Sequence, residues 1–248
     1  MKRIFQTTFL CGMIAISLLS SCKKSTDNPV TSTPTTSALS VTVGDGYGAL
    51  AAVTSVSYST IAGITIPINV NTAVAVFRNT SGSSTMVDGG TVTLNSKTLS
   101  KQSNNAYVYQ NLTDMLTFPP VTWSVSGSGS VPAINYTDDK NMPSYSGYST
   151  LPSSISRATD LTIDLSGMVS DADSVYCQVA DNAKHYLLKR VAGNAGTAVF
   201  TASELSAFTA GTGLVQVAPW NYKQEDISGK TFYFINETCY TKVGITIN

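Results

Sequence analysis

A single histidine, His185, limits the catalytic chemistry that this chain could perform. An enzyme of the Ser-His-Asp or Cys-His type needs an imidazole base and would have to use His185 in the segment Asp181–Tyr186. Gly-x-Ser-x-Gly is absent, no Ser-x-x-Lys follows Cys22, and no glycine-rich phosphate loop is present. We therefore expect no catalytic activity, with His185 as a solvated loop residue before a strand at Tyr186–Leu188.

Acidic residues suggest two further kinds of site. A glycosidase needs two facing carboxylates, and no spacing singles out such a pair among Asp164, Asp171, Asp173, Glu225 and Asp226. Calcium prefers six to eight oxygen ligands, including carboxylates and carbonyls. A calcium site is therefore the more plausible use of the acidic residues, and its candidate ligands are Asp138, Asp139, Asp171 and Asp173. Because Asp is also common at turns and strand ends, the same residues fit a purely structural role.

Aromatic residues beside polar loops indicate a binding surface. Tyr145 and Tyr148 lie in the segment 143–151, whose Ser and Gly residues are too small to cover them. Trp220 and Tyr222 follow Pro219, which we expect to end a strand at Val215–Ala218. Aromatic faces next to amides and carboxylates suit sugar binding by stacking and hydrogen bonding. The alternative is packing between domains or at the end of a sandwich.

Period-two alternation of apolar residues predicts a mostly β-structure from Leu39 onward. Gly- and Asn-rich turns separate the strands, as at 79–82 and 193–196. One helical turn is expected where Thr201 and Glu204 have the spacing of a capping box. The expected strands are Thr72–Arg78, Thr91–Leu94, Val121–Val125, Leu161–Leu165, Val175–Val179, Val215–Ala218, Thr231–Ile235 and Lys242–Ile247.

The N-terminus has the features of a bacterial lipoprotein signal peptide. Lys2 and Arg3 precede the apolar run Phe9–Leu19, which is too short to span a bilayer of roughly 30 Å. The run ends in Leu19-Ser20-Ser21-Cys22, which resembles a lipobox, so residues 1–21 form the predicted signal peptide and Cys22 the lipidation site. Several acyl chains hold a protein far more firmly than one chain does, which predicts stable attachment to the membrane.

Residues 22–38 form the predicted lipidated tether, because Lys23–Ser37 is rich in Ser, Thr and Pro and has too few apolar residues to fold. The chain has equal numbers of acidic and basic residues, and removal of Lys2 and Arg3 leaves the mature part slightly acidic. A nucleic-acid-binding protein would show a basic stripe, and none is present. Nucleic acid is therefore not an expected partner.

The remaining length favours two antiparallel β-sandwich domains. The polar segment Tyr136–Leu151 contains Pro143 and Gly147 and divides two series of strands. We place the boundary near Asn141, giving an N-terminal domain of residues 39–140 and a C-terminal domain of residues 141–248.

Two cysteines of the mature part, Cys177 and Cys239, could form a disulfide after export. Cys177 alternates with Val175 and Val179, while Cys239 shares its parity with Val243, Ile245 and Ile247, so both are predicted to point inward. The bridge would close a loop of about 60 residues and add at most ~4 kcal/mol. Two separate buried thiols are the alternative.

Several phrases from Trp123 to the C-terminus resemble uncharacterised lipoproteins of the Bacteroidota. They are Trp123–Gly127, Asp171–Val175, Val199–Leu205 and Ile227–Phe234. The resemblance implies an immunoglobulin-like C-terminal sandwich and attachment to the outer membrane, and it supplies no catalytic residue. We expect both domains to be immunoglobulin-like sandwiches. Lys23 and Lys24 replace the acidic residues that often direct such proteins to the cell surface. The sequence therefore does not determine which side of the outer membrane the protein faces.

These observations predict a non-catalytic cell-envelope lipoprotein that binds a glycan or an envelope protein. A pilus-type subunit is the alternative, and the absence of any basic processing site between Lys24 and Arg78 argues against it. A carboxylate-based hydrolase is the third alternative.

Overall fold

The computed structural model describes residues 45–61 and 64–248. The predicted signal peptide, Cys22 and the tether lie outside these residues. The all-β class is confirmed, because the described helical segments are only α2 (Ala202–Leu205) and the 3-10 turn η2 (Gly147–Thr150). The predicted capping box is confirmed at α2, where Thr201 and Glu204 each accept from the other's backbone N–H. No helix in the described part of the chain is long and apolar enough to cross a bilayer.

One large sheet forms the centre of the molecule, with the strand order β14-β13-β16-β17-β1-β2-β6-β5. Its neighbours are antiparallel, except that β1 and the short strand β10 run parallel to β17. The members are β1 (Gly48–Ile61), β2 (Ile64–Phe77), β5 (Ser100–Lys101), β6 (Tyr107–Gln110), β10 (Ser154–Ile155), β13 (Ser174–Asp181), β14 (Tyr186–Ala192), β16 (Gly211–Ile227) and β17 (Lys230–Ile247).

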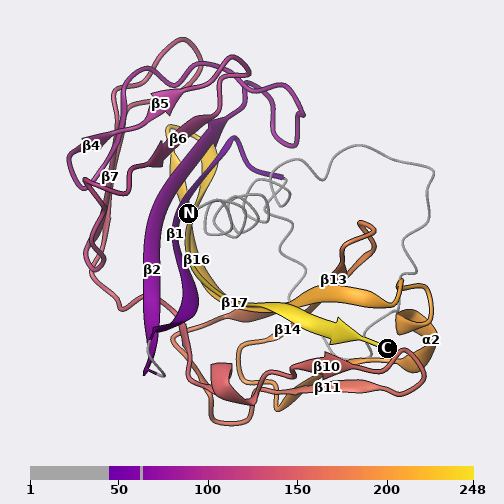
Figure 1. The fold of residues 1–248 in the computed structure, drawn as a ribbon. Helices are drawn as coiled ribbons and strands as arrows, with labels where there is room; N and C mark the ends of the chain where they lie inside the picture. Colours follow the sequence, from indigo (N-terminus) through magenta and orange to yellow (C-terminus); the bar gives the residue numbers. More distant parts are fainter. Residues whose placement is uncertain (1–44, 62–63) are drawn as a thin grey trace.

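The large sheet is strongly bent, and smaller sheets cover its outer side in each half (Figure 1). Figure 1 shows β17 following β1 in one half and then curving into the other, where its partner is β16. The N-terminal half is covered by β3 (Val92–Leu94), β4 (Lys97–Thr98), β7 (Val121–Val125) and β8 (Ile134–Asp138). The C-terminal half is covered by two pairs, β9 (Ser144–Tyr145) with β12 (Val169–Ser170) and β11 (Leu161–Asp164) with β15 (Thr197–Phe200).

Buried apolar side chains form three clusters, which follow from alternation along the strands. The N-terminal core lies between the large sheet and β7, and includes Phe77, Trp123 and Phe232. The C-terminal core includes Cys177 and Phe200 and lies on the same side of the large sheet in the other half. The third, which we name the inner cluster, lies on the opposite side of the large sheet. It comprises Ala49, Ala51, Val53, Val74, Val76, Tyr176, Ala218, Trp220, Tyr233, Ile235 and Cys239.

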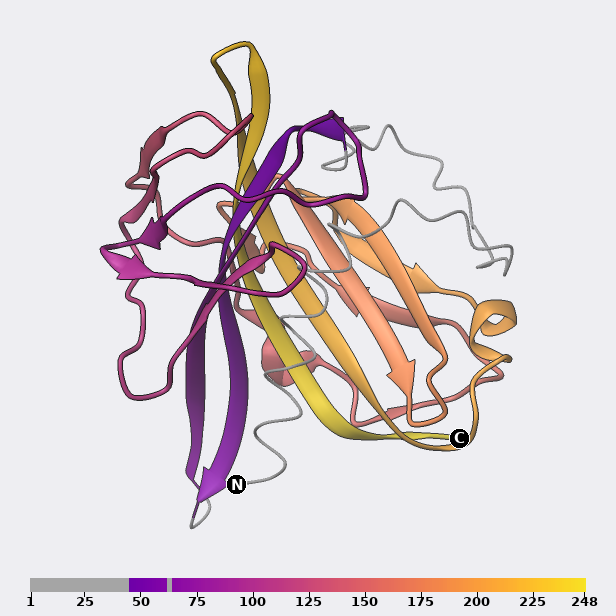
Figure 2. The ribbon, with the colours of Figure 1, turned by 90° about the horizontal axis from the view of Figure 1, so that it is seen from above.

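The two halves share one large sheet, and the expected division near Asn141 stays a prediction. Strands β16 and β17 each run through both halves, so Phe232 lies in the N-terminal core while Ile247 lies in the C-terminal core. The segments Thr231–Ile235 and Lys242–Ile247 were expected as two strands and are one, β17. Figure 2 shows the hairpin of β16 and β17 projecting past the N-terminal half of the sheet.

Pro219 lies within β16 and does not end it. It keeps its register with Val175 of β13. On the other side, the ladder to β17 is interrupted between the pairs Val217↔Tyr240 and Trp220↔Glu237. Because proline has no N–H to donate, β16 passes through Pro219 with this gap in its bonding to β17.

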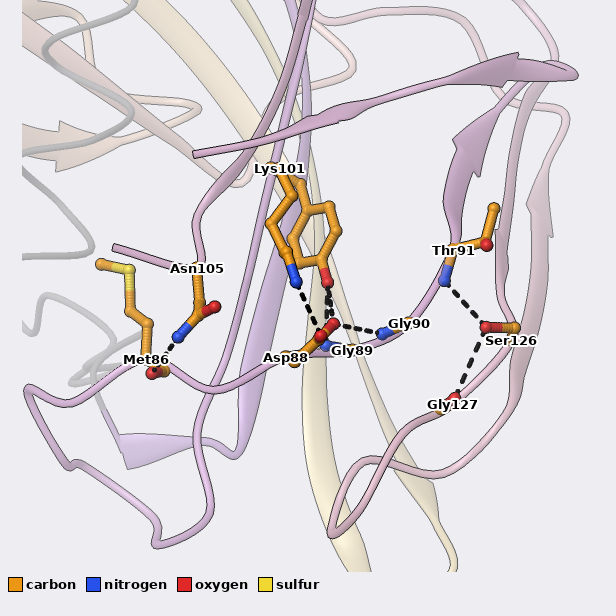
Figure 3. A network of polar contacts seen from close by, with 10 residues as sticks. Met86, Asp88, Gly89, Gly90, Thr91, Lys101, Asn105, Ser126 and Gly127 are labelled. Carbon is orange, nitrogen blue, oxygen red and sulfur yellow. Dashed lines mark hydrogen bonds and ion pairs between the residues drawn. The ribbon is translucent and has the colours of Figure 1, made fainter. Parts of the chain in front are cut away.

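A network of polar contacts ties the loop after β2 to the edge of the large sheet (Figure 3). The carboxylate of Asp88 accepts from the Tyr107 hydroxyl at 2.5 Å, from Lys101 Nζ at 2.7 Å and from Gly90 N–H at 2.8 Å. The hydrogen bond from Lys101 is the main cause that lowers the pKa of Asp88, and burial raises the pKa of Tyr107 to about 12. Nearby, Thr91 N–H donates to the hydroxyl of Ser126 at 2.8 Å. The network therefore connects the large sheet to the start of β3.

Candidate functional site

The four aromatic residues expected to bind sugar do not form one surface. Tyr145 is buried in the C-terminal core, and its hydroxyl donates to the Asp164 carbonyl at 3.1 Å. Tyr148 is half-buried and stacks on Tyr58, with ring centroids 3.9 Å apart. Trp220 is buried in the inner cluster, and the half-buried Tyr222 packs against it. Packing, the alternative considered from the sequence, therefore accounts for Tyr145 and Trp220.

The acidic residues expected to bind calcium lie in two separate places. Asp138 accepts from Asn236 Nδ2 at 3.0 Å beside the exposed Asp139. Asp173 accepts from Tyr222 N–H at 3.1 Å, and Asp171 accepts through its backbone carbonyl from Asn221. No group of three or more His, Cys, Asp or Glu in the described residues is arranged to hold a metal ion. Hydrogen bonds within the fold already engage the carboxylates of Asp138 and Asp173, and calcium binding at these residues stays a prediction.

The predicted disulfide between Cys177 and Cys239 is wrong. Both are buried thiols that form no disulfide, and they lie on opposite faces of the large sheet, Cys177 in the C-terminal core and Cys239 in the inner cluster. The inward and outward alternation of side chains along β17 is broken at Gly244, which has a φ of 75°. Here the register steps from Leu214↔Val243 to Gly213↔Ile245, a β-bulge that reverses which residues of β17 point inward.

We expect both thiols to resist alkylation in the native protein and both to be alkylated after unfolding without a reductant. Burial raises the pKa of Cys177 to about 12, and the reactive species is the thiolate. Mass spectrometry of protein treated with iodoacetamide, with and without denaturant, measures both states. If the unfolded protein were alkylated only after treatment with a reductant, the two cysteines would be joined in a disulfide and this prediction would be wrong.

The most developed polar arrangement in the C-terminal half lies at the turn between β13 and β14. The Asp181 side chain is 1% exposed and accepts three hydrogen bonds. Two come from His185, through Nδ1 at 2.7 Å and the backbone N–H at 2.9 Å, and one comes from Thr209 N–H at 2.8 Å. Asp181 therefore fixes both the turn and the orientation of the imidazole.

The electrostatics of this pair keep Asp181 ionised. Burial works to raise the pKa of Asp181, but the hydrogen bonds from Thr209 and His185 outweigh it, so the pKa is lowered. The carboxylate holds the proton of a neutral His185 on Nδ1, which leaves Nε2 as an acceptor. The ring is 49% exposed and its other contact is edge-to-face with Phe208. Such an imidazole can accept a hydrogen bond from a ligand hydroxyl.

A pocket of about 370 Å³ opens at the same end of the sheet. Its walls are two turns that meet there, because Asn182 N–H donates to the Thr212 carbonyl at 3.2 Å and the Asn182 side-chain amide donates to the Thr212 hydroxyl. The lining offers amide, hydroxyl and backbone groups and consists of Asn182, Ala183, Thr209, Ala210, Gly211 and Thr212.

An exposed apolar row crosses the sheet next to this pocket. Tyr186 follows His185, and its register partners across the sheet are Ala180, Leu214 and Val243. Tyr186 is 67% exposed and Val243 is 56% exposed. The row therefore places an exposed aromatic ring at the same end of the large sheet as the polar pocket.

Sequence reasoning missed Tyr186 and the Asp181–His185 pair as site residues. It placed His185 correctly in the loop before a strand, and the separation of four residues from Asp181 was the available signal for the pair. It also missed Glu237, a carboxyl buried within β17. An acidic residue inside the apolar run Phe232–Tyr240 was the signal there.

Comparison with known proteins leaves this site without a precedent to follow: no family model, curated protein or solved structure matches the chain.

Proposed function

We propose that the protein is a non-catalytic binding module held at the outer membrane by lipid on Cys22. Its ligand is a glycan, and its binding site is the pocket at Asn182 and Thr212 with the rim at His185 and Tyr186. Immunoglobulin-like organisation of the two halves, which the resemblance to Bacteroidota lipoproteins implies for the C-terminal half, belongs to the same proposal.

The observation that carries the proposal is that an exposed aromatic ring and a polar pocket lie at the same end of the large sheet. Tyr186 offers a flat apolar face, while Asn182, Thr209 and Thr212 offer groups that donate and accept hydrogen bonds. A sugar presents an apolar ring face and a rim of hydroxyls, so it needs both kinds of contact. The buried carboxylate of Asp181 supports the site because it holds His185 in one orientation before any ligand arrives.

We expect Tyr186→Ala to weaken glycan binding by about tenfold without lowering the melting temperature, because the ring is largely exposed. A glycan array with the soluble protein that begins at Lys23 identifies the ligand, and calorimetry measures the affinity. Tyr186→Phe keeps the ring and should bind nearly as well as wild type. Leu112→Ala removes an exposed side chain in the other half and is the matched control. Unchanged affinity in Tyr186→Ala would exclude this site.

Anchoring is tested separately by Cys22→Ala. Because the thiol of Cys22 is the predicted acceptor of the lipid, the variant should remain an unlabelled precursor while wild type incorporates radioactive palmitate and partitions into detergent. Equal labelling of the two proteins would refute lipidation at Cys22.

A further inference from the structure

The two halves of the molecule are joined through a short stretch of β16 and β17. We name this stretch the joint and define it as Ala218–Tyr222 of β16 with Ile235–Cys239 of β17. Figure 1 shows that β17 bends as it passes from one half to the other. The ladder between the two strands is interrupted here beside Pro219, so the joint has fewer backbone hydrogen bonds than the rest of the pair.

A carboxyl group is buried at the joint. Glu237 is 1% exposed and lies on the face of the inner cluster. Its register partners are Trp220 on β16 and Val53 on β1, and its neighbours along that face of β17 are Ile235 and Cys239. Oε1 accepts a hydrogen bond from Cys239 Sγ at 3.1 Å. The carboxyl group is therefore placed among mainly apolar side chains.

The charged and titratable groups facing Glu237 do not neutralise it. Tyr176 of β13 and Tyr222 of β16 are on the same face, and Arg190 of β14 lies over the Trp220 ring at 5.6 Å. Within residues 45–61 and 64–248, Glu237 forms no ion pair. A buried charge without a partner is costly, so the neutral form of Glu237 is favoured.

We propose that Glu237 is a proton-sensitive latch of the bend. With a neutral carboxyl group the inner cluster stays packed and the two halves keep their bent arrangement. Loss of the proton places a charge in this apolar cluster and loosens the joint, where the ladder beside Pro219 is already interrupted.

The direction of the pH response follows from burial. Burial raises the pKa of Glu237 to about 7, against a small opposing effect of the Cys239 hydrogen bond. The pKa of Glu237 in the folded state is therefore above its ordinary value of 4.5 in the unfolded chain. The stabilising contribution is therefore complete below the unfolded value and is lost as the pH rises through about 7.

Hydrogen exchange measured by mass spectrometry tests the latch. We expect the amides of the joint in the wild-type protein to lose about tenfold in protection across neutral pH, after correction for the intrinsic exchange rate. Glu237→Gln, which has nearly the same shape and cannot ionise, should show constant protection. Glu225→Gln changes a half-exposed glutamate on the neighbouring strand and should behave as wild type.

Trp220 fluorescence gives a second measurement. In a Trp123→Phe background Trp220 is the remaining tryptophan, since the chain has two. Its emission should change across neutral pH with Glu237 present and stay constant with Glu237→Gln. If Glu237→Gln fails to fold, hydrogen exchange of the wild-type protein across the same pH range still tests the proposal. Constant protection of the joint amides across neutral pH would overturn it. An equal loss of protection in a folded Glu237→Gln variant would overturn it as well.

Discussion

Trp123→Ala should lower the free energy of unfolding by about 3–5 kcal/mol, because it removes the largest side chain from the N-terminal core. Trp123 lies at the centre of β7, where the alternation of buried and exposed residues points it at the large sheet. Its cross-strand partners Leu94 and Tyr136 belong to short strands that cannot move in to fill the space. Chemical denaturation followed by circular dichroism measures the change.

Two control variants separate cavity formation from other effects. Among the described residues the Trp123 indole Nε1 has no hydrogen-bond partner, so Trp123→Phe loses volume only and should cost about 1–2 kcal/mol. Ser124→Ala, at the exposed neighbouring position of β7, should stay within about 0.5 kcal/mol of wild type. Similar costs for Trp123→Ala and Trp123→Phe would show that the core relaxes around the smaller residue.

Asp181→Ala should lower the free energy of unfolding by about 2–3 kcal/mol, because it removes the hydrogen bonds that the buried carboxylate accepts from the backbone N–H groups of Thr209 and His185. The loss should depend on pH in a defined direction. The folded-state pKa of Asp181 is lowered, so its stabilising contribution is present above the unfolded value and disappears as the pH falls through the folded value. The difference between wild type and variant should therefore shrink in acid.

The same variant tests whether Asp181 positions His185. In Asp181→Ala the imidazole loses its Nδ1 partner, and NMR of the His185 ring should show a mixture of tautomers in place of one. Asp139→Ala changes an exposed aspartate in the segment between the two halves and should leave both stability and the ring signals unchanged. A single tautomer in Asp181→Ala would show that Phe208 alone holds the ring.

Local patterns predicted most of the individual strands correctly. Val121–Val125 is β7, Leu161–Leu165 overlaps β11, and Val175–Val179 lies within β13. Buried and exposed residues alternate strictly in β7, as in a half-buried strand. The capping box at Thr201 was predicted as well, since its hydrogen bonds span three residues. The sequence pattern divided the long strand β17 into two predicted strands. The polar residues in the middle of β17 are of the same types as residues found in turns.

Candidate site residues were predicted less well than strands. Trp220 looked exposed because it follows Pro219 and precedes Asn221, which are turn formers in most contexts. Tyr186 went unnoticed because nothing in its neighbours distinguishes an exposed tyrosine in a strand from a buried one. Its exposure depends on the position of β14 at the edge of the large sheet, which is a long-range property.

The sequence by itself determined the secondary-structure class, the inward and outward phase of strands such as β7, and the cap of α2. These features depend on contacts within a few residues, which composition and spacing record. Tertiary structure alone decided that β16 and β17 pass through both halves, that the bulge at Gly244 places Cys239 away from Cys177, and that Glu237 is buried at the bend. The physical reason is that pairing between distant strands sets register and burial, and a shift of one residue moves every side chain that follows to the other face.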